Sequence, residues 1–425
     1  MYTGVTALAR EMSSSSWWCF LVAALLVSAL VVTGTTTEDE VCEQDKNCFL
    51  PNCLCGSVTH PGNIPFDEVP QFVVLSFDSA VRDTNIEFYL KFKDFMNPND
   101  CRITMTFFLS HLYANYPMVN ELHRIGHEIG LHSVTSKSDV ENYWRPANES
   151  VWMHEMEDLR TIIENNAFID KKHLKGWRAP YLELGGDEMF SALNELGLEY
   201  DCSWPTLRYT NWFGSNPIGA LWPYTLDYPS IQDCQLGRCP TKRYNGTWVV
   251  PMIDLNDNTG EACAMLDNCN GMSDELLRNP DAIEGFLKRN FNLNYLNNKA
   301  PFGIFTHYSW FLEGHLNGTD AREIGYTRFL EWLSNKDDVY VVSVDRLLEW
   351  MKNPVPLSEV GTLDAFKCSA DPRPDCVDPQ EYTFSTEDNL PNSLDEVIMG
   401  SCTRPQPDYY PWLYNPEGDL NIPAV

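Results

Sequence analysis

Apolar and polar positions follow two alternating patterns from residue 71 onward. Short runs of consecutive apolar residues are typical of buried strands, and the longer segments between them repeat apolar residues at helical spacing. The predicted strands are 72–77, 103–109, 128–132, 176–179, 248–253, 302–307 and 339–342, and the predicted helices are 117–125, 151–164, 187–196, 283–296, 319–333 and 344–351.

Repeated strand–helix units predict a parallel sheet closed by outer helices. We expect a distorted (β/α) barrel of seven or eight strands over residues 70–352, and an open doubly wound sheet is the alternative. No G-x-G-x-x-G sequence follows a strand, so the usual dinucleotide-binding signature is missing.

The segments outside the barrel have a different composition. Residues 38–69 form a Cys-rich lead-in, which we interpret as a disulfide-rich strap against the barrel. Residues 205–247 interrupt the alternation and predict a long loop over the barrel mouth. Residues 353–425 are rich in Pro and acidic side chains, and they predict an irregular tail wrapped on the barrel.

Several features indicate export from the cell. The uncharged apolar run 17–34 follows Arg10 and predicts a signal peptide over residues 1–37, and an uncleaved membrane anchor is the alternative. Outside this segment 13 of the 14 Cys remain, which favours a disulfide framework with one cysteine left over. Three sequons fit a secreted glycoprotein: Asn148, Asn245 and Asn317.

The formal charge of −30 narrows the class of partner. A strongly acidic surface repels phosphate backbones, so a nucleic-acid partner is not expected. A neutral glycan is compatible with this charge, and a cationic glycan is attracted to it. We expect no membrane partner unless the signal stays uncleaved, and we expect a monomer.

Polar residues stand where predicted barrel strands end. In such barrels the functional residues lie at the carboxyl ends of the strands. Five polar residues occupy or adjoin these positions, and together they supply groups for acid–base hydrolysis: Asp78, His132, Arg178, Asp201 and His307.

The order and spacing of these residues resemble those of the NodB-homology polysaccharide deacetylases (carbohydrate esterase family 4), especially arthropod chitin deacetylases. The stretches GHEIGLHS at 126–133 and RAPY at 178–181 carry the resemblance most specifically. It covers roughly residues 70–352. The Cys-rich lead-in is also similar to that of insect members.

The resemblance implies a role for each catalytic position. Asp78 would be the base and Arg178 would orient it. His307 would be the general acid, with Asp201 as its partner, and the Tyr181 backbone N–H would face the oxyanion.

The family's metal site is not preserved. Its ligands are an aspartate and two histidines, and this chain has Ser79, His132 and Ser136 at the three positions. Serine hydroxyls are poor zinc ligands, so we expect no cofactor unless zinc is held by a recruited residue such as Asp83 or Asp139.

The sequence therefore predicts a secreted chitin deacetylase-like protein that binds chitin or a related N-acetylglucosamine glycan. Its deacetylase activity is expected to be lost or weak, which makes it a pseudoenzyme. The alternative is an active metal-dependent chitin deacetylase with a recruited ligand. Because aromatic faces stack on sugar rings, Trp204 and Trp310 are the expected substrate-binding residues.

Overall fold

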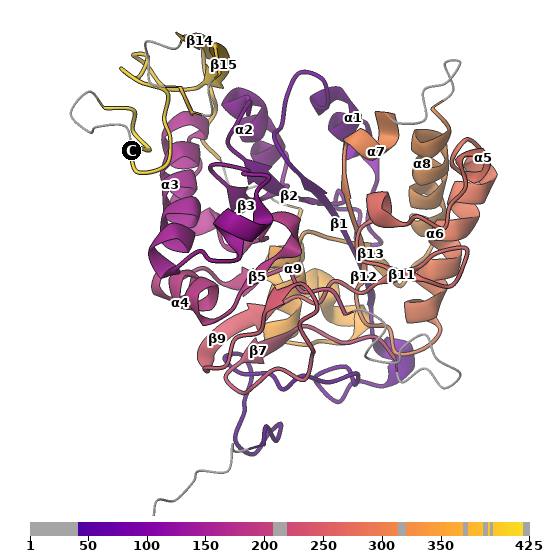
Figure 1. Cartoon of the computed structure of the whole chain (residues 1–425). Helices are drawn as coiled ribbons and strands as arrows, with labels where there is room; N and C mark the ends of the chain where they lie inside the picture. Colours follow the sequence, from indigo (N-terminus) through magenta and orange to yellow (C-terminus); the bar gives the residue numbers. More distant parts are fainter. Residues whose placement is uncertain are drawn as a thin grey trace, which may run out of the picture. The chain divides into compact units, whose positions relative to one another are not determined.

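A computed structural model of the chain describes residues 41–206, 219–312, 320–368, 373–385, 390–391 and 394–419. The predicted signal peptide and the sequon at Asn317 lie outside these residues. Within them, one mixed α/β unit is built around a nine-stranded sheet (Figure 1).

The sheet is almost entirely parallel. Its order is β12 (Phe302–His307), β1 (Gln71–Asp78), β2 (Thr106–Ser110), β3 (Glu128–Ser133), β4 (Gly176–Trp177), β6 (Tyr200–Asp201), β9 (Tyr244–Val249) and β7 (Tyr224–Leu226), and β13 (Val339–Val341) also pairs with β1. Only β7 is antiparallel to its neighbour. This arrangement confirms the predicted distorted (β/α) barrel.

Helices cover the strands on both sides. The longer ones are α2 (Tyr116–Arg124), α3 (Glu149–Ala167), α4 (Asp187–Glu195), α6 (Pro280–Tyr295), α8 (Ala321–Leu333) and α9 (Val344–Lys352). In Figure 1, α3 and α4 lie on one side of the strands, and α6 and α8 lie on the other. Three short helices were not predicted from the sequence: α1 (Ile86–Leu90), α5 (Asp274–Leu277) and α7 (Ser309–Leu312).

Local chemistry explains where these elements begin. Every residue of β1 is buried, as expected for a parallel strand that is covered on both faces. Helix α3 begins where Asn148 Oδ1 accepts a hydrogen bond from Val151 N at 3.1 Å. Helix α6 has Pro280 in its first turn, after a similar cap from Asn279.

Six disulfides confirm the predicted framework. Two of them, Cys42–Cys55 and Cys48–Cys53, lie in the N-terminal strap, which pairs with the β7 region through hydrogen bonds between Leu54 and Thr225. Among the described cysteines, Cys202 alone is free, and it is buried.

The C-terminal tail is more ordered than predicted. It contains a hairpin of β14 (Gln380–Ser385) and β15 (Glu396–Ser401), beside α2 and α3 in Figure 1. The disulfide Cys101–Cys368 joins the start of the tail to the barrel. Because two antiparallel strands bury little surface alone, this hairpin depends on its contact with the barrel.

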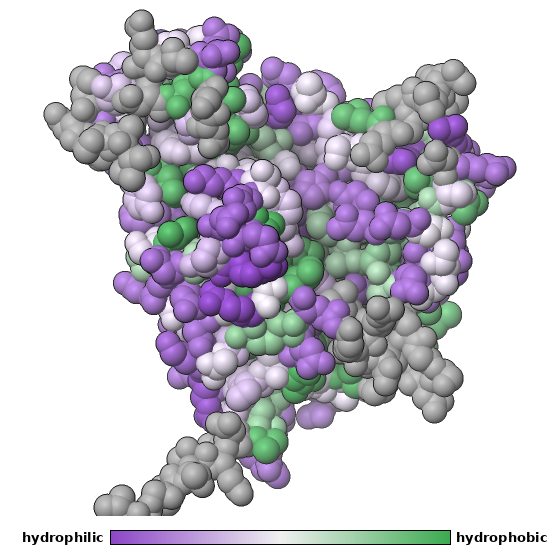
Figure 2. Space-filling view, viewed as in Figure 1, coloured by the Kyte–Doolittle hydropathy of each residue, from purple (hydrophilic) through white to green (hydrophobic). Residues whose placement is uncertain are grey.

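The surface carries both polar and apolar side chains. Polar side chains cover most of the face in Figure 2, and apolar side chains form smaller patches. In the described part of the chain, no helix is both long enough and apolar enough to cross a bilayer.

Candidate active site

The carboxyl ends of neighbouring strands bring most of the predicted residues together. Asp78 ends β1 and His307 ends β12, and the two are paired in the sheet register. His132 lies in β3, and Arg178 directly follows β4. Because these strands are parallel neighbours, the four side chains share one end of the barrel.

Asp78 and Arg178 form a buried ion pair. Arg178 Nη1 lies 2.6 Å from Asp78 Oδ1, and the two side chains are 0% and 2% exposed. Arg178 Nη1 also donates to Ser76 Oγ at 2.8 Å, and its guanidinium lies over the Phe108 ring. Burial raises the pKa of Asp78, but Arg178 and two nearby histidines outweigh it, so the net pKa is below the usual value. Asp78 is therefore a carboxylate near neutral pH.

His132 is oriented by its second ring nitrogen. Its Nδ1 lies 2.9 Å from the Arg178 carbonyl oxygen, which can only accept, so Nδ1 carries the proton. Burial is the main cause of a lowered His132 pKa, so the ring is neutral. The lone pair is then on Nε2, and the ring lines the same cavity as Ser79 and Ser136.

The partner of His307 is Asp267, and the prediction of Asp201 was wrong. His307 Nδ1 lies 2.5 Å from Asp267 Oδ2. Burial lowers the pKa of His307, but Asp267 and Asp78 outweigh it and the net pKa is raised. Asp201 instead accepts the Ser203 hydroxyl at 2.6 Å, and burial raises its pKa to about 6. Because Asp267 follows no predicted strand, a search of strand ends could not find it.

The two predicted tryptophans do not offer a sugar-binding face. Trp204 and Trp310 are only 1% and 3% exposed, so the prediction that they bind substrate was wrong. Trp204 donates its ring N–H to the Asp233 carbonyl at 3.0 Å. Among the described residues, the exposed aromatics that line the mouth are Tyr113 and Tyr181, at 39% and 54% exposure.

Two adjoining cavities open at this end of the barrel. Their volumes are about 370 and 390 Å³. Tyr113 and Tyr308 line the first, and Tyr181 lines the second. They are two lobes of one groove because they share five lining residues: Asp78, Ser79, Ser110, Ser136 and His307.

The residues at the family's metal positions do not fit a zinc ion. Ser79 and Ser136 offer neutral hydroxyls, and Ser136 Oγ lies 3.4 Å from Ser133 Oγ. His132 is the single remaining strong donor among the three positions, whereas structural and catalytic zinc sites use at least three protein ligands.

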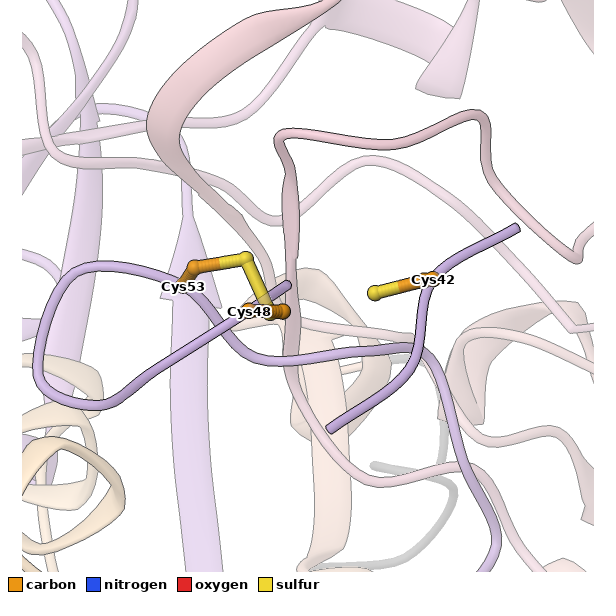
Figure 3. A group of neighbouring side chains, drawn as sticks. All are labelled: Cys42, Cys48 and Cys53. Carbon is orange, nitrogen blue, oxygen red and sulfur yellow. A yellow bond between two sulfur atoms is a disulfide. The ribbon is translucent and has the colours of Figure 1, made fainter. Parts of the chain in front are cut away.

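No recruited ligand completes the metal site within the described residues. Neither Asp83 nor Asp139 lines the groove, and Asp139 caps a helical turn by accepting Asn142 N at 2.9 Å. Among the described residues, the only group of three or more His, Cys, Asp or Glu side chains close enough to share an ion comprises three strap cysteines (Figure 3). Their sulfurs are in disulfides and cannot act as thiolate ligands.

The sequence of the chain is similar to that of known proteins. The family model for polysaccharide deacetylase matches residues 67–200. Chitin deacetylase 8 of Bombyx mori is 34% identical over 379 residues, which is 89% of this chain and 93% of that protein. Chitin deacetylase 1 of the same species is 34% identical over 394 residues, which is 88% of this chain and 68% of that protein.

Among solved structures, a probable polysaccharide deacetylase from Pseudomonas aeruginosa is 14% identical with a TM-score of 0.40, over 69% of this chain and 96% of that one. That likeness is too low to support a conclusion about the site. The identity to the two Bombyx mori chitin deacetylases, over nearly nine-tenths of the chain, is high enough to establish the family. The chain belongs to the polysaccharide deacetylase family.

Proposed function

We propose that this protein binds chitin or a related N-acetylglucosamine glycan in the groove and has lost most or all of the family's deacetylase activity. The observation that carries the proposal is the donor set at the mouth. Ser79 and Ser136 occupy two of the three metal positions, and His132 is left alone.

The groove retains the groups that a neutral sugar needs. The rings of Tyr113 and Tyr181 stand in different lobes, where each can stack on the apolar face of a sugar. The Asp78 carboxylate accepts hydrogen bonds from sugar hydroxyls or an acetamide N–H. The hydroxyls of Ser79 and Ser136 both donate and accept.

Without a bound metal ion, the site is less suited to catalysis than to binding. Asp78 and His307 can still accept and donate protons, and Arg178 and Asp267 hold them in place. A bound ion supplies several kcal/mol of transition-state stabilisation at the amide carbonyl. Because each 1.36 kcal/mol is tenfold in rate, losing it costs roughly a thousandfold or more.

A second candidate is an active deacetylase, and the intact Asp78–Arg178 and His307–Asp267 pairs favour it. It needs a recruited metal ligand, and Asp83 and Asp139 are engaged outside the groove. We favour the binding function for that reason.

We also propose that the protein is secreted and works in an oxidising, extracellular setting. Its six disulfides support this proposal because such bonds persist outside the reducing cytosol. Cleavage of the predicted signal before Glu38 is tested by N-terminal sequencing of protein recovered from the medium.

Titration calorimetry with N-acetylated chitin oligomers tests the binding function. The unaltered protein should bind, and Tyr113→Ala and Tyr181→Ala should each weaken affinity by about tenfold, the value of one lost aromatic contact. Tyr409→Ala is the matched control, since Tyr409 lines neither lobe. Absence of binding by the unaltered protein, or equal losses in all three variants, would overturn the proposal.

A further inference from the structure

A second cavity, of about 580 Å³, lies at the opposite end of the barrel. Thr104, Gly126 and Lys175 line it, and they stand just before β2, β3 and β4. The cavity therefore sits at the amino ends of the strands, whereas the groove sits at their carboxyl ends. The two sites have no lining residue in common.

The cavity concentrates positive charge in a protein of net charge −30. The chain has 30 Lys and Arg residues against 60 Asp and Glu. Basic residues outnumber acidic ones around this cavity, whose acids are Asp100, Asp345, Glu349 and Asp364. The cations are Arg102, Arg124, Lys175, Arg346, Lys367 and Arg373.

Several of these cations are already paired. Arg124 lies 2.7 Å from Asp375, and Lys175 lies 3.1 Å from Glu199. Arg373 donates to the backbone carbonyls of His123 in α2 and of His127, just before β3. These contacts neutralise or engage part of the cavity's positive charge, but they do not involve the guanidinium groups of Arg102 and Arg346.

Arg102 and Arg346 have no carboxylate within 4.0 Å in the part of the chain that the structure describes. Arg346 is the more telling of the two because it is half-buried, and burial lowers its pKa. Its Nη2 lies beside Gly126, 3.8 Å from where a β-carbon would stand. The neighbouring Asp345 offsets this burial only in part. A partly desolvated cation without a close ion pair is costly, and an anion in the cavity offsets that cost.

The surroundings hold these cations in place and keep other groups neutral. Arg102 and Lys367 directly precede or follow the two cysteines of the Cys101–Cys368 disulfide, which itself lines the cavity. Nearby His127 is buried, and burial together with Arg346 and Arg373 lowers its pKa to about 3.

We propose that this cavity binds a tetrahedral oxyanion, a phosphate or sulfate group, with Arg346 and Arg102 as its main donors. The planar fork of a guanidinium matches the oxygen spacing of phosphate and sulfate. The volume exceeds that of a bare ion, so either a free anion or a sulfated sugar fits. The proposal is independent of glycan binding at the groove.

Calorimetry and thermal unfolding of the full chain test the proposal, with inorganic phosphate, inorganic sulfate and N-acetylglucosamine 6-sulfate as probes. Each is compared with chloride at equal ionic strength. Saturable binding and a rise in Tm are expected for at least one probe. Binding of the inorganic ions identifies a free-anion site, and binding of the sugar sulfate alone identifies a glycan sulfate.

Two variants locate the site. Arg346→Gln should weaken binding by about tenfold or more, the value of a lost charge-assisted pair. It should keep or raise the Tm in chloride, because it removes a partly buried cation that has no carboxylate within 4.0 Å in the described part of the chain. Arg102→Gln, at an exposed position, should weaken binding severalfold. Arg328→Gln is the control, since Arg328 pairs with Asp281 on the surface. Chloride-like behaviour of every probe, or unchanged affinity in both cavity variants, overturns the proposal.

Discussion

Replacing Arg178 by Met tests whether the buried ion pair organises the mouth of the barrel. The substitution keeps an unbranched apolar stem against Phe108 but removes the charge that faces Asp78. Breaking a buried pair by removing one partner costs about 3–5 kcal/mol, because the remaining charge is uncompensated. We expect a loss of this size in the free energy of unfolding, measured by urea titration at pH 7.5 with the disulfides intact.

The pH dependence separates charge from packing. In the unaltered protein the pKa of Asp78 is lowered, so its contribution is present above about pH 4 and is lost as the pH falls through the folded-state pKa. In Arg178→Met the pKa of Asp78 is raised instead, so the penalty should shrink as the pH falls.

The matched control is Arg328→Met, which removes a surface pair with Asp281 of 2.7 Å and should cost less than about 1 kcal/mol. Similar losses for Arg178→Met and the control, or a penalty at Arg178 that does not change with pH, would refute the reasoning.

Three further predictions concern other parts of the molecule. Asp267→Asn should lower the pKa of His307, measured by NMR titration of the ring, and an unchanged pKa would rule out Asp267 as its partner. In the unaltered protein the raised His307 pKa stabilises the fold at low pH, and this contribution is lost as the pH rises through the folded-state pKa of His307. A chain beginning at residue 38 should show one thiol, Cys202, that reacts with Ellman's reagent only after unfolding, since burial raises its pKa to about 11; reaction in the native state would contradict the fold. Trp204→Phe should lower the Tm and leave chitin-oligomer affinity within about twofold, because the ring is in the core; a large loss of affinity would return Trp204 to the binding site.

The barrel could be predicted from sequence because its central strands are continuous apolar runs. The predicted strand 302–307 has the same bounds as β12, and 72–77 lies inside β1. Strand β6, Tyr200–Asp201, has only two residues and gives no run to detect. Its pairing with β4 and β9 is a tertiary effect that local pattern does not record.

The candidate site was predicted where side chains follow strands and missed elsewhere. Asp78, His132, Arg178 and His307 meet as expected. Asp267 lies within the short loop closed by the Cys263–Cys269 disulfide, and only the folded chain brings it to His307. The spacing of two cysteines signals such a loop, but it does not say which residue the loop presents.

The aromatic residues show the same limit. A tryptophan near a strand end serves the core as readily as a groove, and both Trp204 and Trp310 are buried. Tyr113 and Tyr181 have positive φ angles of 67° and 58° and lie in short turns. Sequence alone does not reveal which of these rings reaches the surface.

Acetate release from chitin oligomers, measured with zinc content on the same samples, tests whether the loss of two metal ligands has abolished the deacetylase activity. We expect the unaltered protein to hold far less than one zinc per chain and to release little or no acetate. The double variant Ser79→Asp, Ser136→His should bind zinc stoichiometrically and release acetate in a chelator-sensitive reaction. Stoichiometric zinc and acetate release by the unaltered protein would show that its metal site is functional and that deacetylase activity is retained.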